Sequence, residues 1–166
     1  MKIAYIGGIK SGKSSLAEQK ALEMCSDFKP YYLATTELND DDEMKQRVEK
    51  HKERRKDQFI TIEEPLNIYD VIKSCNNIVL VECLTIWINN MLYYAKPNNE
   101  IFNCLTKVLL LNQSIIFVLN EVGLGIIPDN PLARQFIDIS GAVSQLLGKH
   151  CNEVYFCSAG LSLKIK

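Results

Sequence analysis

The chain has 166 residues, of which 47% are hydrophobic and 23% are charged, with 19 basic and 20 acidic side chains. These values fit one globular domain over residues 1–166 and exclude a disordered chain, which would carry fewer apolar residues and a larger charge imbalance. No apolar run approaches the ~20 residues of a membrane span. The net charge of −1 predicts no bulk attraction to nucleic acid or to an anionic membrane.

Strand and helix patterns alternate along the chain. In order, they predict a strand at 3–6, a helix at 14–24, a strand at 31–34, a polar helix at 40–56, a strand at 59–62, a helix at 66–74, a strand at 78–81, helices at 84–95 and 100–111, a strand at 115–119, a helix at 132–150 and strands at 154–157 and 161–165. Such alternation predicts an α/β fold with a mostly parallel sheet flanked by helices. Too few residues join the last two strands for a helical crossover, so we expect an antiparallel hairpin at one edge.

The cysteine pattern bears on the compartment. Six cysteines stand at 25, 75, 83, 104, 151 and 157, none of them in C-x-x-C spacing and most of them in apolar runs. With two histidines and no Cys/His cluster, a structural zinc site is not expected. We expect reduced, mostly buried thiols in a cytoplasmic protein.

The strongest motif is GGIKSGKS, from Gly7 to Ser14, which fits G-x-x-x-x-G-K-[ST] between the first predicted strand and the first predicted helix. Glycines let backbone N–H groups turn toward phosphates, and the helix N-terminus adds positive partial charge. Lys13 is expected to reach the β- and γ-phosphates, and Ser14 to place its hydroxyl on Mg²⁺. The motif predicts a bound nucleoside triphosphate without naming the reaction.

A carboxylate ends the apolar strand predicted at 78–81. Glu82 follows Ile78-Val79-Leu80-Val81 directly. The carboxyl ends of parallel strands face the ligand crevice of an α/β fold, so Glu82 is expected to bind Mg²⁺ directly or through water. A solvated strand-end acid is the alternative.

One histidine lies in the predicted helix at 40–56. His51 falls in the basic run 50–56 and shares a helical face with the apolar Met44 and Val48. Neighbouring cations favour a neutral, nucleophilic imidazole, which could attack the α-phosphorus of a bound triphosphate and carry the nucleotide covalently. Taken from the residues alone, a structural histidine in a solvated basic helix is the simpler interpretation.

A Gly-rich segment follows the strand predicted at 115–119. It begins Asn120-Glu121-Val122-Gly123 and continues to Pro131. Two interpretations stand side by side: a loop that binds substrate or closes over the site, and a simple turn.

Taken together, these segments resemble the bifunctional adenosylcobinamide kinase/adenosylcobinamide-phosphate guanylyltransferases of cobalamin synthesis. The resemblance covers nearly the whole chain and rests on GGIKSGKS, YLATTELNDDDEM with VEKHKERR, ITIEEPL, VLVECLTIWINNML, NEVGLGIIPDNPLAR, ISGAVSQLLG and AGLSLKIK. The P-loop is shared by many families. The acidic helix start with His51 behind it, and the NEVG segment, are more specific.

The resemblance implies a RecA-like P-loop fold and two activities. The first phosphorylates the aminopropanol hydroxyl of adenosylcobinamide with ATP or GTP. The second transfers GMP from GTP to adenosylcobinamide phosphate, giving adenosyl-GDP-cobinamide and pyrophosphate. It also implies a homotrimer. No nucleic acid is expected as a partner.

The resemblance further implies residue roles. The guanylylated histidine falls on His51, with Lys13 as a second catalytic residue, and Ser14 and Glu82 are the expected Mg²⁺ ligands. The nucleotide-binding positions implied are Gly7, Gly8, Ile9, Lys10, Ser11, Gly12, Lys13, Ser14, Ser15, Ala34, Thr35, Thr36, Lys52, Glu53, Arg54, Arg55, Glu63 and Glu82.

Two alternatives to the bifunctional enzyme remain. One is another P-loop small-molecule kinase with a structural His51, which would transfer only the γ-phosphoryl group. The other is a nucleotide-dependent switch that binds a partner.

Overall fold

The structure, a computed structural model, describes residues 1–25, 28–37 and 56–166. The helix expected at 40–56, and with it His51 and residues 52–55, lies outside the described residues apart from Lys56. The interpretation of that segment therefore stays a prediction.

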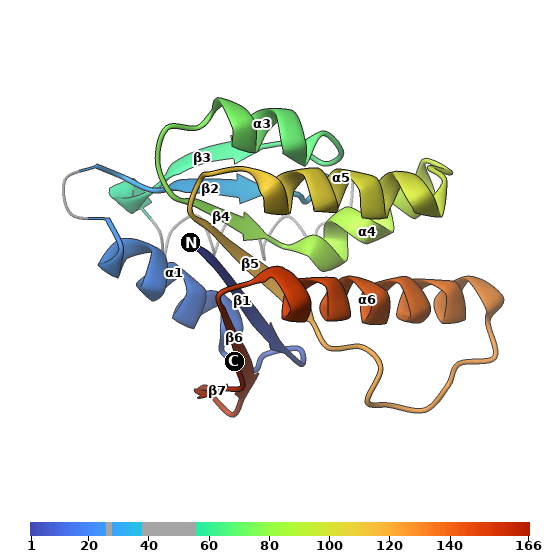
Figure 1. The fold of residues 1–166 in the computed structure, drawn as a ribbon. Coiled ribbons are helices and arrows are strands. Elements are labelled where there is room, and N and C mark those ends of the chain that lie inside the picture. The colour runs from blue at the N-terminus through green and yellow to red at the C-terminus, as the bar shows by residue number, and fades with distance from the viewer. Residues whose placement is uncertain (26–27, 38–55) are drawn as a thin grey trace.

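The elements alternate as the sequence predicts (Figure 1). In chain order they are β1 (Lys2–Gly7), α1 (Lys13–Glu23), β2 (Tyr31–Ala34), the short 3-10 helix η1 (Lys56–Gln58), β3 (Ile60–Glu63), α3 (Ile68–Ser74), β4 (Val79–Glu82), α4 (Leu84–Tyr93), α5 (Asn98–Leu110), β5 (Ile115–Asn120), α6 (Pro131–His150), β6 (Glu153–Ser158) and β7 (Leu161–Lys164).

The strands form one seven-stranded sheet in the order β3-β2-β4-β5-β1-β6-β7. All neighbouring pairs are parallel except β6 and β7, which form the predicted antiparallel hairpin at the edge. β5 lies between β1 and β4, so the strand that leads to GGIKSGKS and the strand that ends in Glu82 are not neighbours. This arrangement confirms the mostly parallel α/β class.

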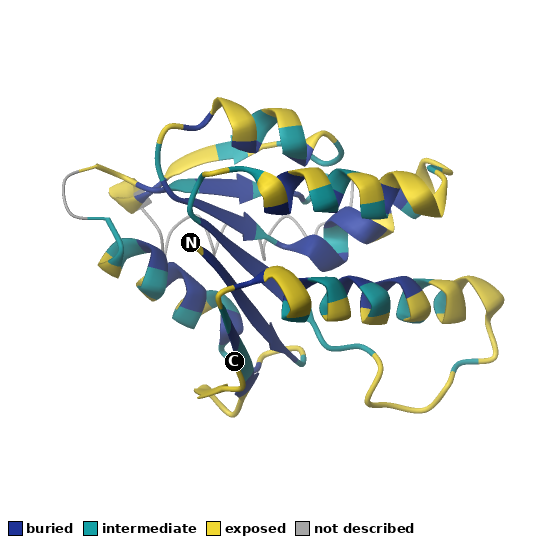
Figure 2. Cartoon of the chain, viewed as in Figure 1, coloured by how far each residue is buried: buried dark blue, intermediate teal, exposed yellow. Residues whose placement is uncertain are grey.

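Helices pack on both faces of the sheet. The side chains of β5 alternate accordingly: Ile115, Phe117 and Leu119 enter a large core under α3, α4, α5 and α6, whereas Ile116 and Val118 face α1. This period of two is the geometry of a strand with both faces covered. The central strands are accordingly buried along their length (Figure 2).

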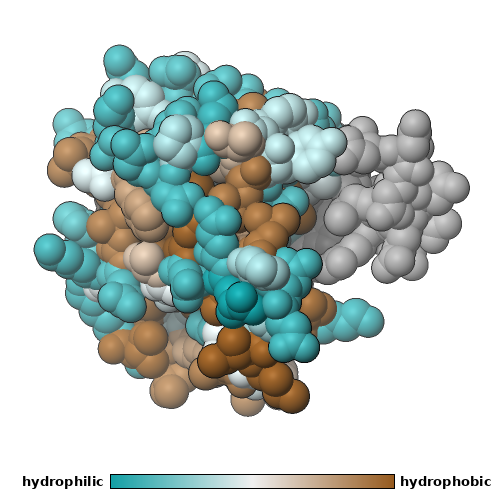
Figure 3. Space-filling view, turned by 90° about the vertical axis from the view of Figure 1, so that its right-hand side faces the viewer, coloured by the Kyte–Doolittle hydropathy of each residue, from teal (hydrophilic) through white to brown (hydrophobic). Residues whose placement is uncertain are grey.

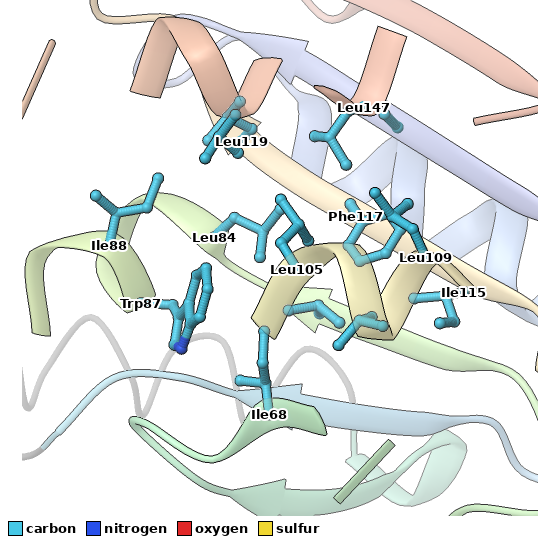
Figure 4. Close-up of a cluster of buried hydrophobic side chains, with 14 of the residues drawn as sticks. Ile68, Leu84, Trp87, Ile88, Leu105, Leu109, Ile115, Phe117, Leu119 and Leu147 are labelled. Atoms are coloured by element: carbon cyan, nitrogen blue, oxygen red, sulfur yellow. The ribbon is translucent and has the colours of Figure 1, made fainter. Parts of the chain in front are cut away.

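The larger core centres on Trp87 of α4, which is fully buried between Ile68 of α3 and Leu105 of α5 (Figure 4). Its indole N–H donates to the carbonyl of Leu66 at 2.9 Å, so the polar atom of the ring is satisfied inside the core. The packing fixes α4, which begins at Leu84 with only Cys83 between it and Glu82.

Helix boundaries differ from the prediction by up to two residues; α3, for example, begins at Ile68 rather than at Leu66. α4 ends at Tyr93 rather than at Ala95, because Ala95 takes a left-handed backbone conformation (φ 50°) that a helix cannot continue through. α5 begins at Asn98 rather than at Glu100, since the extended Pro97 caps it and Glu100 falls in its first turn.

The six cysteines are all free, and four of them are buried, in agreement with the expected reduced thiols. In the described part of the chain, no helix is both long enough and apolar enough to cross a membrane.

Candidate active site

The P-loop sits where the sequence predicts, between the buried strand β1 and helix α1. The Ser11 N–H donates to the Gly8 carbonyl at 3.2 Å, and the Leu16 N–H donates to the Gly12 carbonyl at 3.1 Å, so a tight turn leads straight into the helix. The buried hydroxyl of Ser11 has no hydrogen-bond partner among the described residues. A phosphate oxygen in the loop would satisfy such a hydroxyl.

Lys13 lies over this loop. Only 7% of the residue is exposed, and its Nζ donates to the Gly8 carbonyl at 3.1 Å. A buried ammonium is costly unless it is paired, and a single carbonyl is a weak partner for a full positive charge. The position therefore favours an anion in the loop.

Ser14 and Glu82 meet across the sheet edge. The Ser14 hydroxyl donates to Oε1 of Glu82 at 2.8 Å, joining the first turn of α1 to the end of β4. The two side chains are distant in sequence. The sequence predicts that both bind Mg²⁺, but it does not predict this direct hydrogen bond.

The Ser14–Glu82 pair fits Mg²⁺ by its chemistry, because a hydroxyl and a carboxylate are the hard oxygen donors that this ion prefers. The described residues hold no cluster of three or more His, Cys, Asp or Glu side chains suited to a metal. A Mg²⁺ ion held here would take its other ligands from phosphate oxygens and water, as is usual for nucleotide-bound Mg²⁺.

The strand register gathers the other predicted positions at the same carboxyl edge. Ala34 pairs with Glu63 on one side and with Glu82 on the other, and Gly7 pairs with Asn120. Carboxyl ends of parallel strands form the usual ligand crevice. The edge therefore brings together Ala34, Glu63 and Glu82 from three strands.

Thr35 is built into the framework rather than open to solvent. It is fully buried, its hydroxyl donates to the Cys83 carbonyl at 2.8 Å, and the same oxygen accepts the Cys83 N–H at 3.0 Å. Asn90 of α4 donates to the Thr35 carbonyl at 2.7 Å. The side chain thus fixes the end of β2 against the end of β4, while the neighbouring Thr36 is half-buried.

The C-terminal hairpin supports the P-loop. This contact is not predicted by the sequence analysis. The Gly160 N–H, at the β6–β7 turn, donates to the Ser11 carbonyl at 2.9 Å. A Cβ built on Gly12 would lie 2.8 Å from the Gly160 Cα, and one built on Gly7 would collide with the Cys157 carbonyl oxygen. The glycines are therefore needed for close packing as well as for phosphate access, and the Ala159-Gly160 dipeptide was the only signal in the sequence.

We expect Gly12→Ala to destabilise the fold by about 1–3 kcal/mol, because Gly12 combines a left-handed backbone (φ 91°) with that contact. Thermal unfolding measures the loss, and nucleotide affinity should fall with it. Gly8→Ala is the matched comparison for stability, since a Cβ there meets nothing within 4 Å. Equal melting temperatures for the two variants would contradict the role assigned to the Gly12–Gly160 contact.

The thiol of Cys83, the residue after Glu82, is poorly suited to carry a nucleotide. Burial, with the Glu82 charge beside it, raises the pKa of Cys83 to about 11, so the group is a neutral thiol at pH 7. Cys157, whose carbonyl oxygen packs against Gly7, also has its pKa raised by burial.

The predicted site residues thus divide into two groups. Those on the P-loop, on β2 with Thr35 and Thr36 after it, on β3 and on β4 lie along one edge of the sheet. His51, Lys52, Glu53, Arg54 and Arg55 lie outside the described residues.

A family model described as cobinamide kinase/cobinamide phosphate guanyltransferase matches residues 3–165. The chain belongs to this family. Among its relatives, the bifunctional adenosylcobalamin biosynthesis protein CobP of Pseudomonas aeruginosa is 35% identical over 175 residues, covering 100% of this chain and 98% of its own. The bifunctional adenosylcobalamin biosynthesis protein CobU of Escherichia coli is also 35% identical, over 185 residues and 100% of both chains.

Solved structures support the fold alone. The flagellar accessory protein FlaH of Methanocaldococcus jannaschii aligns with a TM-score of 0.51 at 12% identity, over 98% of this chain and 75% of that chain. An ATPase of a bacterial type III secretion system also aligns with a TM-score of 0.51, at 11% identity, over 95% of this chain and 51% of that chain. The predicted P-loop class is confirmed, and kinase and guanylyltransferase are the activities of the family.

Proposed function

We propose that this cobinamide kinase/guanylyltransferase performs both transfers at one P-loop, the second of them through a guanylylated His51. The observation that carries the proposal is the joining of Lys13, Ser14 and Glu82 at one sheet edge in a chain that matches the family over residues 3–165. A P-loop can serve either transfer, because the outcome depends on which phosphorus meets a nucleophile.

In the kinase step, the aminopropanol hydroxyl of adenosylcobinamide attacks the γ-phosphorus of ATP or GTP. The new O–P bond forms as the bond to the β-phosphate oxygen breaks, so a nucleoside diphosphate leaves and the hydroxyl proton passes to solvent. The N–H groups of the loop and the Lys13 ammonium hold the phosphates and stabilise the developing negative charge.

In the guanylyl step, an imidazole nitrogen of His51 attacks the α-phosphorus of GTP. A P–N bond forms, the α–β phosphoanhydride bond breaks and pyrophosphate leaves. An oxygen of adenosylcobinamide phosphate then attacks the same phosphorus, the P–N bond breaks, and the free histidine returns with adenosyl-GDP-cobinamide as product. The cations Lys52, Arg54 and Arg55 are proposed to bind the triphosphate during this step. Glu53 is proposed as a nucleotide contact on the resemblance alone.

Mg²⁺ is the proposed cofactor, held by Ser14 and Glu82. When bound, it neutralises phosphate charge. The short Ser14–Glu82 hydrogen bond supports a shared ligand position for these two side chains.

Replacing Glu82 with Gln should raise the Mg²⁺ concentration needed for half-maximal kinase activity at least about tenfold, because a charged ligand becomes a neutral one. Steady-state rates across a Mg²⁺ titration measure it. Glu23→Gln is the control, since Glu23 lies at the far end of α1 and pairs with Gln19. An unchanged Mg²⁺ requirement in Glu82→Gln would contradict the metal role.

A homotrimer is proposed on the resemblance and on exposed apolar side chains. Leu124, Ile126 and Ile127, between β5 and α6, are 80%, 96% and 78% exposed. Figure 3 shows apolar side chains along the lower part of the face where this segment runs in Figure 1. Contiguous apolar surface of this kind favours association. Analytical ultracentrifugation of the pure protein tests the state, and a monomer at micromolar concentration would contradict it.

A cytoplasmic location is proposed as well. Its support is the six free cysteines, since an oxidising compartment favours disulfide formation.

The two-step function is tested with pure protein, Mg²⁺, ATP, GTP and adenosylcobinamide. Chromatography should resolve adenosylcobinamide phosphate first and adenosyl-GDP-cobinamide after it. Formation of the phosphate alone would reduce the function to that of a kinase, and formation of neither product would overturn the proposal.

A further inference from the structure

A pocket of about 330 Å³ opens beside the P-loop edge of the sheet. One wall is the end of β5 with residues 121–123, and the other is the middle of α6, residues 137–145. None of the predicted nucleotide-binding residues lines it, whereas residues 120–123, at the start of the Gly-rich segment, do. The volume lies at the low end for small-molecule sites, so the pocket suits part of a large ligand rather than the whole of one.

The pocket is connected to the P-loop through the backbone. Gly7 pairs with Asn120, and the Glu121 N–H donates to the Gly7 carbonyl at 3.0 Å. Gly7, the first residue of the P-loop, is thus hydrogen-bonded to Glu121 in the pocket wall. A ligand in the pocket therefore lies beside the strand end from which the P-loop starts.

The lining combines polar and apolar groups. Ser140 is only 3% exposed, and its hydroxyl has no hydrogen-bond partner in the described part of the chain. Oε1 of Glu121 accepts the Gly123 N–H at 2.6 Å, which fixes that carboxylate in the wall. Val122 and Ile137 supply apolar surface. A buried hydroxyl without a partner is costly, and a ligand that hydrogen-bonds to it removes the cost.

We infer that this pocket receives the aminopropanol arm of the cobinamide acceptor. The inference rests on the proposed function and adds the place where the acceptor binds. The arm is small and neutral and combines a methyl group with a hydroxyl and an amide, which matches the mixed lining.

Charge sets the direction in which the arm lies. The pocket carries the carboxylates of Glu121 and Asp138, which repel a phosphate group. The hydroxyl end of the arm, which carries the phosphate, is therefore placed at the mouth of the pocket, toward Lys13 and the P-loop, while the rest of the arm lies along the pocket and leads through its amide to the corrin ring, which stays outside. The same placement serves both transfers, because both occur at the same end of the arm.

Gly141 offers a direct test, because it lines the pocket and a Cβ there meets nothing within 4 Å. Gly141→Leu should fill the pocket and raise the Kd for cobinamide at least about tenfold. Gly148→Leu is the matched control, since Gly148 lies two turns further along α6, also has open space at its Cβ and does not line the pocket. Equilibrium dialysis, read by the visible absorbance of the corrinoid, measures both. A Kd for Gly141→Leu within twofold of the parent protein would overturn the inference.

Ser140→Ala gives a second test that does not depend on steric blocking. It should weaken cobinamide binding about fivefold by removing one hydrogen bond, with no fall in melting temperature, because the hydroxyl has no partner in the described part of the chain. Lower stability with unchanged cobinamide affinity would overturn the inference.

The same protein preparations distinguish an error in the pocket assignment from an error in the proposed function. Covalent guanylylation from GTP needs no acceptor, so it should be equal in the parent protein, Gly141→Leu and Ser140→Ala. A parent protein that binds cobinamide but is never guanylylated contradicts the proposed function and leaves the pocket supported by its Gly141 sensitivity. A parent protein that is guanylylated but does not bind cobinamide overturns the pocket.

Discussion

Lys13→Ala should lower both the kinase rate and the guanylyltransferase rate by about 10²–10³-fold. The Lys13 ammonium donates to the Gly8 carbonyl of the loop, and each transfer develops negative charge on phosphate oxygens there. Losing one preorganised donor to such charge has this magnitude of effect. Single-turnover measurements with saturating GTP, one for each product, determine the two rates.

Lys20→Ala serves as the control for Lys13→Ala, because Lys20 lies in the last turn of the same helix. Both of its rates should stay within about twofold of the parent protein, as for a surface substitution. If Lys13→Ala lost only one of the two activities, separate phosphate sites would have to serve them, and the single P-loop would be wrong.

His51→Asn should abolish guanylyl transfer, by at least about 10⁴-fold, while kinase activity stays within a few-fold. Asn cannot form the phosphoramidate, whereas the kinase step uses the substrate hydroxyl as its nucleophile. The measurement follows adenosyl-GDP-cobinamide from supplied adenosylcobinamide phosphate and, separately, adenosylcobinamide phosphate from adenosylcobinamide.

The chain supplies its own control for this variant. His150, at the end of α6, is exposed and is the only other histidine. His150→Asn should retain both activities. Equal loss of both activities in His51→Asn would assign His51 to nucleotide binding or folding rather than to covalent transfer.

Local signals made much of the fold predictable. The apolar runs at 78–81 and 115–119 lie in or overlap β4 and β5, and GGIKSGKS fixed the first strand, loop and helix. Such motifs carry their own geometry, because a buried parallel strand must be apolar and a phosphate loop must be Gly-rich. The closing hairpin followed from the short connection between β6 and β7.

Features that depend on distant pairing could not be predicted from those signals. The position of β5 between β1 and β4 follows from the order of strands in the sheet. The Thr35 hydroxyl donates to the Cys83 carbonyl, and Gly160 packs on Gly12. Each pair joins residues far apart in sequence. The pocket beside Gly7 likewise needs α6 to lie against the end of β5. Residue patterns report local conformation, whereas these contacts depend on the tertiary fold.

The most direct test of the central claim is covalent labelling from GTP. The pure protein and His51→Asn are incubated with Mg²⁺ and GTP labelled at either the α- or the γ-phosphorus, then denatured and counted. The two-step account predicts acid-labile, base-stable label from α-labelled GTP only, and none in His51→Asn. The absence of label from either position, with GTP binding intact, would contradict it and favour a P-loop kinase with a structural His51.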